Sequence, residues 1–430
     1  MSIVLEQAEA ALEQGNWGLL YQSLQQLLID QAIETLPSST LERVLELAIA
    51  ILEAGDFQER WDVAKLLPAF GDRAIDPLID LLCDDEAAPD VRWFAARALG
   101  SYPQPHVINA LLELLQTTDE DDLRSIAAEA LATIGSPVIA ALTEMLAQDD
   151  TRLFAVRSLA TIRRSETIDP LLTVVDDHSP TIRAIALGAL GSFHDPRIPP
   201  VLIQGLQDQK ATVRQVAIKE LGFCTDPSLQ PNLVNLLSEY LQDQDASVRQ
   251  EAAIALGRLG ADAGADALFA VLKSPQTPPL LQTESVWALN RIGTLKALDY
   301  LRQALHQFSQ PAALPLYHTI LVAIGRWESV ATQPQAAQVL TEALAMPLTI
   351  EQPMLRQAIA NGLGALNQPN TLETLIALLA HEEMSVRLHA IAALKALDAS
   401  TAHQRLKALA SRPDVPAALK QGAMIALQEW

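Results

Sequence analysis

Large aromatic residues recur close to arginines in the sequence, at spacings that would place both on the same face of a helix. Trp93, Phe94 and Arg97 stand together in one segment, and Phe154 and Arg157 repeat that arrangement in a later one. Residues four apart share a helix face. Aromatic rings and guanidinium groups are the side chains that most often dominate binding energy. These residues therefore predict an exposed contact surface for a protein partner or a planar anionic ligand.

Further aromatic residues extend this surface. Trp61 directly follows Arg60, as Trp93 follows Arg92, and we predict that it belongs to the same contact site. A second, weaker group comprises Trp287, Tyr317 and His318. The competing interpretation is that Phe94 and Phe154 pack beneath neighbouring helices as ordinary core residues.

Signatures of catalysis and metal binding are absent from the sequence. There is no G-x-G-x-x-G, P-loop, G-x-S-x-G or H-E-x-x-H motif, so no catalytic residue is assigned and enzymatic activity stays undecided. His381 precedes two glutamates, but the next histidine is His389, which is too distant for a metal-binding helix turn. The Asp-Asp pairs lie at expected turns and are interpreted as solvated helix caps. Cys83 and Cys224 form no C-x-x-C motif and are expected to be small buried residues.

Charge and hydropathy restrict the classes of partner. The formal net charge is −22, which repels nucleic-acid phosphate and anionic lipid, so neither is an expected partner. No apolar run is long enough for a membrane-spanning helix, and the first residues do not resemble a secretory signal. We therefore expect a cytoplasmic protein without an integral membrane segment.

An internal repeat organises the elements that position these side chains. An acidic turn, an aliphatic-Arg pair and an Ala-rich helix ending near Leu-Gly return at intervals of 28 to 39 residues between positions 60 and 387. Gln282 and Tyr317 occupy the arginine position in two degraded copies. A second amphipathic segment, such as residues 138–146, precedes each Ala-rich helix. The pattern predicts about eleven stacked helical hairpins, an all-α solenoid with the arginine-bearing helices lining its concave face.

The repeated residues have structural explanations. We expect each arginine to bond to acidic groups of a neighbouring repeat, with a row of ligand-binding arginines as the alternative. An acidic residue at the start of the second helix should cap its N–H groups. Glycine after the last leucine is expected to end the helix in a left-handed conformation.

Differences in repeat quality predict four segments. Residues 1–55 lack the anchor and are expected to form a helical cap. Regular repeats follow over 56–272. Residues 273–350 begin with a proline-rich break and carry the degraded copies, where we expect a bend and not an independent domain. Clear repeats and a second cap are expected over 351–430.

The segments from Asp90 to Gly100 and from Asp122 to Leu131 carry a family resemblance. They resemble the phycobiliprotein lyase HEAT-like repeat family of cyanobacterial bilin lyases and antenna-associated proteins. The resemblance implies a HEAT-like α-α superhelix and, for the lyases, binding of a linear tetrapyrrole and a phycobiliprotein subunit whose cysteine receives the bilin.

Three functions follow as hypotheses. The first is a protein-binding scaffold or chaperone for phycobilisome or other photosynthetic proteins. The second is a bilin lyase, or one subunit of one, for which a phycobilin would be a transient ligand rather than a resident cofactor. The third is a general adaptor unrelated to pigments. A closed pocket beside Trp93 and Arg97 would favour the lyase, and a broad shallow groove would favour the scaffold.

Overall fold

The protein is built from α-helices arranged in hairpins. A computed structural model describes residues 3–30 and 37–430. It is 78% helical, and the described residues contain no strand. The predicted all-α solenoid is therefore confirmed. The chain divides into two compact units, Met1–Ile198 and Pro199–Trp430, which we call unit 1 and unit 2.

The helices of unit 1 follow one another with short connections. Their bounds are α1 (Ile3–Glu13), α2 (Trp17–Asp30), α3 (Ser38–Ala54), α4 (Phe57–Ala64), α5 (Ile75–Cys83), α6 (Pro89–Leu99), α7 (Pro105–Thr117), α8 (Asp121–Ile134), α9 (Ile139–Met145), α10 (Asp149–Ile162), α11 (Ile168–Leu172) and α12 (Pro180–Leu190). Helix α13 (Ile198–Gly205) begins at the last residue of unit 1.

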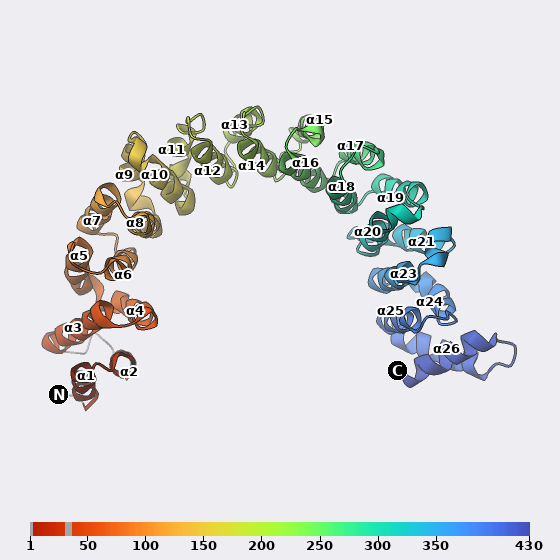
Figure 1. The fold of residues 1–430 in the computed structure, drawn as a ribbon, viewed down its shortest axis with the longest axis horizontal. Helices are drawn as coiled ribbons and strands as arrows, with labels where there is room; N and C mark the ends of the chain where they lie inside the picture. The colour runs from red at the N-terminus through yellow and green to blue at the C-terminus, as the bar shows by residue number, and fades with distance from the viewer. Residues whose placement is uncertain (1–2, 31–36) are drawn as a thin grey trace. The chain divides into compact units, whose positions relative to one another are not determined.

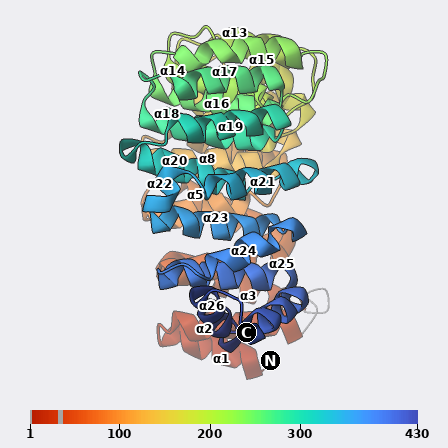
Figure 2. The same cartoon turned by 90° about the vertical axis from the view of Figure 1, so that its right-hand side faces the viewer.

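Unit 2 continues the same alternation. Its helices are α14 (Ala211–Leu221), α15 (Gln230–Glu239), α16 (Ala246–Leu259), α17 (Asp262–Lys273), α18 (Pro279–Ile292), α19 (Leu295–Gln307), α20 (Leu314–Gly325), α21 (Gln333–Ala343), α22 (Pro347–Glu351), α23 (Pro353–Leu366), α24 (Leu372–Leu378), α25 (Met384–Ser411) and α26 (Ala417–Gln428). Within this unit α17, α19 and α21 follow one another with roughly parallel axes (Figure 2).

Each unit, taken by itself, has two rows of helices. The helices at the anchor positions form an inner row: α4, α6, α8, α10 and α12 in unit 1, and α14, α16, α18, α20, α23 and α25 in unit 2 (Figure 1). The anchor is an arginine in all of them except α18 and α20, which carry Gln282 and Tyr317. Their partners, such as α5, α7, α17 and α19, form an outer row. Consecutive inner helices pack directly on one another, as α6 does on α8 and α16 on α18. Alanine makes this possible because it lets two backbones approach closely.

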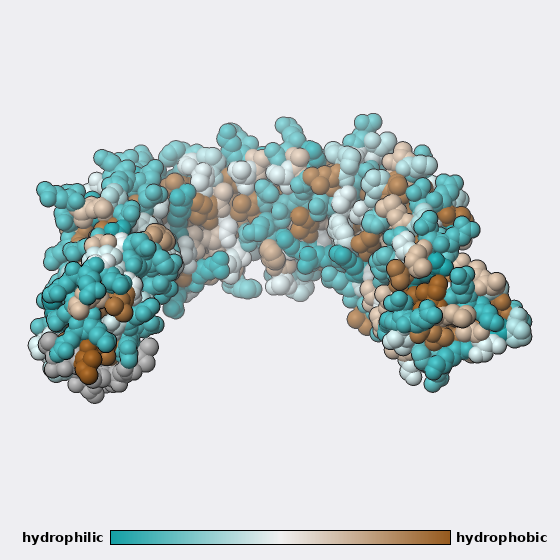
Figure 3. All heavy atoms as spheres, turned by 60° about the horizontal axis from the view of Figure 1, so that its bottom comes forward, coloured by the Kyte–Doolittle hydropathy of each residue, from teal (hydrophilic) through white to brown (hydrophobic). Residues whose placement is uncertain are grey.

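The core lies between the rows. Helix α8 shows why these sequences fold in this way: Leu123, Ala127 and Leu131 recur every four residues and are all buried. Several helices begin with proline, whose missing N–H costs nothing at that position, as Pro89 does in α6. On the face turned to the viewer in Figure 3, hydrophobic residues form separate patches among hydrophilic ones.

The repeated arginines bond mainly to backbone carbonyls of the turn before their own helix. Arg92 Nε donates to Leu82 O at 3.0 Å, and Arg249 Nη1 donates to Asp243 O at 2.7 Å. Some also reach the next repeat, as predicted: Arg152 Nη1 lies 3.2 Å from Asp177 Oδ2. The guanidinium therefore satisfies carbonyls that a helix end leaves unpaired, besides joining repeats.

The prediction that glycine ends these helices in a left-handed conformation holds for Gly135 only in its positive φ of 84°, because its ψ of −133° lies outside the left-handed helical region. It is wrong for Gly100 and Gly222, whose φ values are −59° and −64°. A Cβ on Gly100 would lie 3.1 Å from Ala130 Cα, and one on Gly222 would lie 2.8 Å from Ala255 Cβ. Glycine is needed at these positions because the neighbouring inner helix leaves no room for a side chain.

Other expectations have mixed outcomes. Residues 273–350 keep the two-helix pattern through α18, α19 and α20, while the four predicted segments and the bend stay predictions. Cys83 was expected to be buried and is exposed, because it ends α5; Cys224 is half-buried. Among the described residues no single helix is long and apolar enough to cross a membrane. One pair bent by 117°, Asp121–Ile134 with Ser136–Met145, passes that test by length and composition only.

Candidate functional site

An aromatic cluster with one arginine joins the first two inner helices of unit 1. Trp61 comes from α4, and Trp93 and Arg97 come from α6. The Arg97 guanidinium carbon lies 4.1 Å from the centre of the Trp61 ring and 5.6 Å from that of Trp93. The positive charge is therefore held between two indole rings from neighbouring repeats, a favourable cation–π arrangement.

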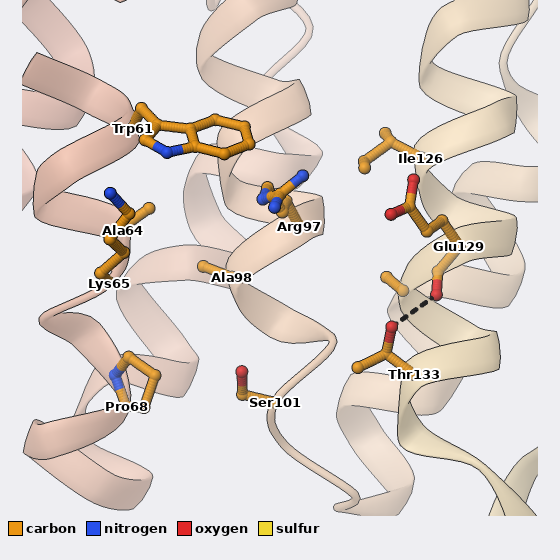
Figure 4. A pocket seen from close by; sticks show the side chains of 11 residues that line it. Trp61, Ala64, Lys65, Pro68, Arg97, Ala98, Ser101, Ile126, Glu129 and Thr133 are labelled. Atoms are coloured by element: carbon orange, nitrogen blue, oxygen red, sulfur yellow. Dashed lines mark hydrogen bonds between the residues drawn. The ribbon is translucent and has the colours of Figure 1, made fainter. Parts of the chain in front are cut away.

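A groove opens beside this cluster between α4, α6 and α8. We call it the tryptophan groove; its volume is about 260 Å³. Trp61 forms one wall and Glu129 points into the groove from the opposite wall, with Arg97 between them (Figure 4). The lining residues are Trp61, Ala64, Lys65, Pro68, Arg97, Ala98, Ser101, Ile126, Glu129, Ala130 and Thr133.

The charged side chains of the groove are Lys65, Arg97 and Glu129. Lys65 lies 5.8 Å from the Trp61 ring centre and is paired with Asp62 at 2.8 Å. Arg97 has no carboxylate within ion-pair distance in the part of the chain that the structure describes, although it is exposed and the chain is strongly acidic. An exposed guanidinium fixed between two rings is ready to accept a carboxylate from another molecule.

The sequence did not single out Phe57, which completes the cluster. Its ring is 63% exposed, lies 6.1 Å from the Trp61 ring and meets Phe94 edge-on at 5.3 Å. Phe57, Trp61 and Lys65 are spaced by four residues, so helical spacing was the signal that places all three on one side of α4.

Three predicted contact residues lie in the core instead. Phe94 and Tyr317 are fully buried, and Phe154 is 9% exposed. The expectation that these rings face outward is therefore wrong, and the alternative that Phe94 and Phe154 pack beneath neighbouring helices is correct. The Tyr317 hydroxyl contacts Met346 Sδ at 3.0 Å and Thr349 Oγ1 at 3.1 Å.

The remaining predicted residues are accessible but do not join the cluster. Arg157 is exposed on α10, and no ring lies over its guanidinium among the described residues. Trp287 is half-buried on α18, and His318 is half-buried on α20, both in unit 2. The structure thus brings together only Trp61, Trp93, Phe94 and Arg97 of the predicted set. The described residues contain no group of three or more side chains placed to hold a metal ion.

Two-helix repeats stacked in series through an inner and an outer row define an α-helical repeat protein. The particular family is shown by sequence: HEAT repeats match residues 45–132, 87–153, 136–222, 199–280, 233–311 and 348–428. The chain belongs to the HEAT-repeat family. No curated protein sequence matches it.

Solved structures share the fold. Importin beta crystallised in ammonium sulfate is 15% identical with a TM-score of 0.54, over 97% of this chain and 63% of importin beta. Kap95p, from a study of its effect on the switch loops of RanGDP, is 14% identical with a TM-score of 0.55, over 99% of this chain and 65% of that one. Kap121p bound to RanGTP is 16% identical with a TM-score of 0.55, over 91% and 48%. This chain thus spans less than two thirds of each of them, and the likeness shows the fold alone.

Proposed function

We propose that this chain is a binding scaffold for another protein and that the tryptophan groove is its principal contact site. The observation that carries the proposal is Arg97, held between Trp61 and Trp93 without a carboxylate of its own. Rigid aromatic anchors around an arginine are typical of the centre of a protein interface. The partner is expected to present an acidic side chain flanked by apolar ones.

The shape of the groove favours a scaffold over an enzyme. The groove lies open between three helices, and its charged groups are Lys65, Arg97 and, on the opposite wall, Glu129. A catalytic pocket needs a closed cavity in which polar groups converge on a reacting atom. The open groove instead suits a surface that holds a partner, as a scaffold or assembly chaperone does.

For the partner we propose a phycobiliprotein subunit or another photosynthetic protein. The support is the resemblance of the Asp90–Gly100 segment to the lyase-type HEAT repeats. Two residues of that segment, Trp93 and Arg97, form part of the aromatic cluster.

The first experiment is affinity capture from the native host with the parent chain, followed by an absorbance spectrum of the captured material. The Trp93→Ala, Arg97→Ala double variant is compared with Arg157→Ala, which removes an arginine from the equivalent position of α10. We expect the double variant to lose at least about 2 kcal/mol of affinity, the usual scale for a hot spot. Equal binding by the parent and the double variant contradicts the proposed site.

A second experiment separates the three functions. The parent chain is mixed with a purified phycobiliprotein apo-subunit, with and without free bilin. Binding of the subunit without faster covalent attachment supports the scaffold. Faster attachment supports the lyase. Failure of both, together with colourless captured material, supports an adaptor unrelated to pigments.

A further inference from the structure

A second groove lies on the inner row of unit 2, between α20, α23 and α25. We call it the histidine groove; its volume is about 430 Å³. Its floor is the contact between α20 and α23, where Gly325 and Gly362 face each other so closely that a Cβ on Gly325 would lie 2.6 Å from Gly362 Cα. Ala358 and Ala365 continue this floor of small residues. Small residues leave a trough in which larger side chains of another helix can lie.

The walls of the histidine groove carry donors and no carboxylate. His318 and Arg326 come from α20 or its end, and His389 comes from α25. The His389 Nδ1 contacts Ser385 O at 2.6 Å. Because a carbonyl only accepts, Nδ1 carries the proton and donates, and Nε2 of the neutral ring is an acceptor that can donate to a carboxylate only in the protonated imidazole. Arg326 has no ion-pair partner in the described part of the chain.

Exposed apolar side chains occur in the groove and elsewhere on α25, one of the helices that form it. Met354 lines it and is 44% exposed. Met384 and Leu388 are 46% and 45% exposed, and their spacing of four residues places them on one side of α25, the helix that packs on α23. Methionine-rich surfaces are typical of sites that accept apolar helix faces.

We propose that the histidine groove binds an acidic amphipathic helix of a partner protein. Charge complementarity selects this occupant: the chain has 52 acidic and 30 basic residues, yet the groove lining holds an arginine, two histidines and no acid. The apolar side of the helix lies against the glycine-alanine floor and Met354, and a carboxylate on its polar side faces Arg326. The site is separate from the tryptophan groove and does not depend on it.

The probe is a library of phage-displayed random 16-residue peptides. The bait is the full chain carrying Trp93→Ala and Arg97→Ala, so that the tryptophan groove cannot account for any binding. Selected peptides are then measured by fluorescence anisotropy against the same bait with one further change. Arg326→Glu and Met354→Ser alter the groove. Arg291→Glu and Leu280→Ser are matched controls, since Arg291 is an exposed arginine of α18 and Leu280 follows the first proline of its helix as Met354 does.

We expect enriched peptides to be acidic, with apolar residues three or four apart. Their affinity should fall at least tenfold with Arg326→Glu and with Met354→Ser, and should stay unchanged in both controls. The proposal is overturned if no peptide is enriched, if the peptides are neutral or basic, or if the groove variants bind like the controls. It is also overturned if phosphatidylglycerol vesicles bind the bait through Arg326 while peptides do not. A negative result in this experiment does not bear on the proposed function of the tryptophan groove, because that groove carries the two alanine substitutions in every bait.

Discussion

Arg214 forms two parallel hydrogen bonds with Asp243 of the next repeat. Its Nε and Nη2 each donate to one of the two carboxylate oxygens, at 2.8 Å. The backbone carbonyl of Asp243 also accepts a hydrogen bond of 2.7 Å from Nη1 of Arg249, which belongs to the same repeat as Asp243. Asp177 is used in the same way in unit 1, by Arg152 through its carboxylate and by Arg183 through its carbonyl. One aspartate thus joins the anchor arginines of two consecutive repeats.

The first prediction concerns this pair. Arg214→Ala should destabilise unit 2 by about 2 kcal/mol. It leaves the largely buried Asp243 carboxylate with only the Asp245 N–H as a donor, and it removes the Arg214 donor from two turn carbonyls. Thermal unfolding followed by circular dichroism measures the loss. Arg291→Ala, which removes an exposed arginine without such bonds, is the control. A melting temperature equal to the parent's, together with lost partner binding, would favour the ligand-binding reading of the arginine row.

The second prediction concerns acid. Burial raises the pKa of Asp243, but hydrogen bonds from Arg214 and from the Asp245 backbone outweigh it and hold that pKa below 3.8. The folded state therefore binds fewer protons than the unfolded chain, so this stabilisation is complete above about pH 4 and is lost as pH falls through the lowered pKa. Urea unfolding between pH 5 and pH 2 should show a smaller acid-induced loss in Asp243→Asn than in the parent. Equal losses would contradict the prediction.

The third prediction concerns helix spacing. In Gly362→Ala the new Cβ would lie 2.8 Å from both Gly325 Cα and Leu340 Cδ1, so α20 and α23 must move apart. We expect a loss of about 1–3 kcal/mol, the usual cost of overpacking. Gly18→Ala in α2, whose Cβ would meet only Glu59 Oε1 at 3.8 Å, should be neutral or stabilising. Urea unfolding of both variants makes the comparison.

The fourth prediction separates core from contact residues. Tyr317→Phe removes the hydroxyl that contacts Thr349 in the core and should cost about 1 kcal/mol of stability. Because the ring is fully buried, partner binding should be unchanged once the variant is folded. Loss of binding without loss of stability would restore Tyr317 as a contact residue.

The fifth prediction concerns the cation between the rings. Arg97→Lys keeps the charge but loses the guanidinium that lies 4.1 Å from the Trp61 ring centre, and should weaken partner binding by about 1 kcal/mol. Arg157→Lys should leave the affinity unchanged. Trp61 fluorescence, with the signals of the other tryptophans subtracted through a Trp61→Phe variant, reports whether the stacked geometry itself has changed. Identical affinities for Arg97→Lys and the parent would limit the role of Arg97 to its charge.

The fold was predictable because its determinants are periodic. The anchor arginine and the alanine-rich helix recur in the sequence, and each copy adds the same hairpin. The site was predictable only in part, because moving one residue along a helix turns a side chain from the inner face to the core. Trp93 and Arg97, one and five residues after the anchor Arg92, share the inner face. Phe94 is about 100° further round and is buried against Phe57 of α4.

Other features had no local signal. Tyr317 occupies the anchor position itself, but it is fully buried and its hydroxyl contacts Met346 and Thr349 of the following repeat, not the turn before its own helix. The role of Gly100 and Gly222 depends on Ala130 and Ala255 of the following repeats, which no pattern within one helix reveals. Arg97 has no ion-pair partner among the described residues, and this too could not be read from the sequence of one helix, because it depends on which side chains surround Arg97 in the fold.

The aspartate shared by two arginines has a mechanical consequence. When force separates repeats from one end of a unit, detaching the Arg214 helix from Asp243 breaks both parallel hydrogen bonds together. Asp243 then still holds Arg249 through its carbonyl, so the next hairpin keeps its own turn closed. Under load such a stack would come apart in discrete steps of one hairpin, each beginning at a joint of this kind, rather than stretching evenly.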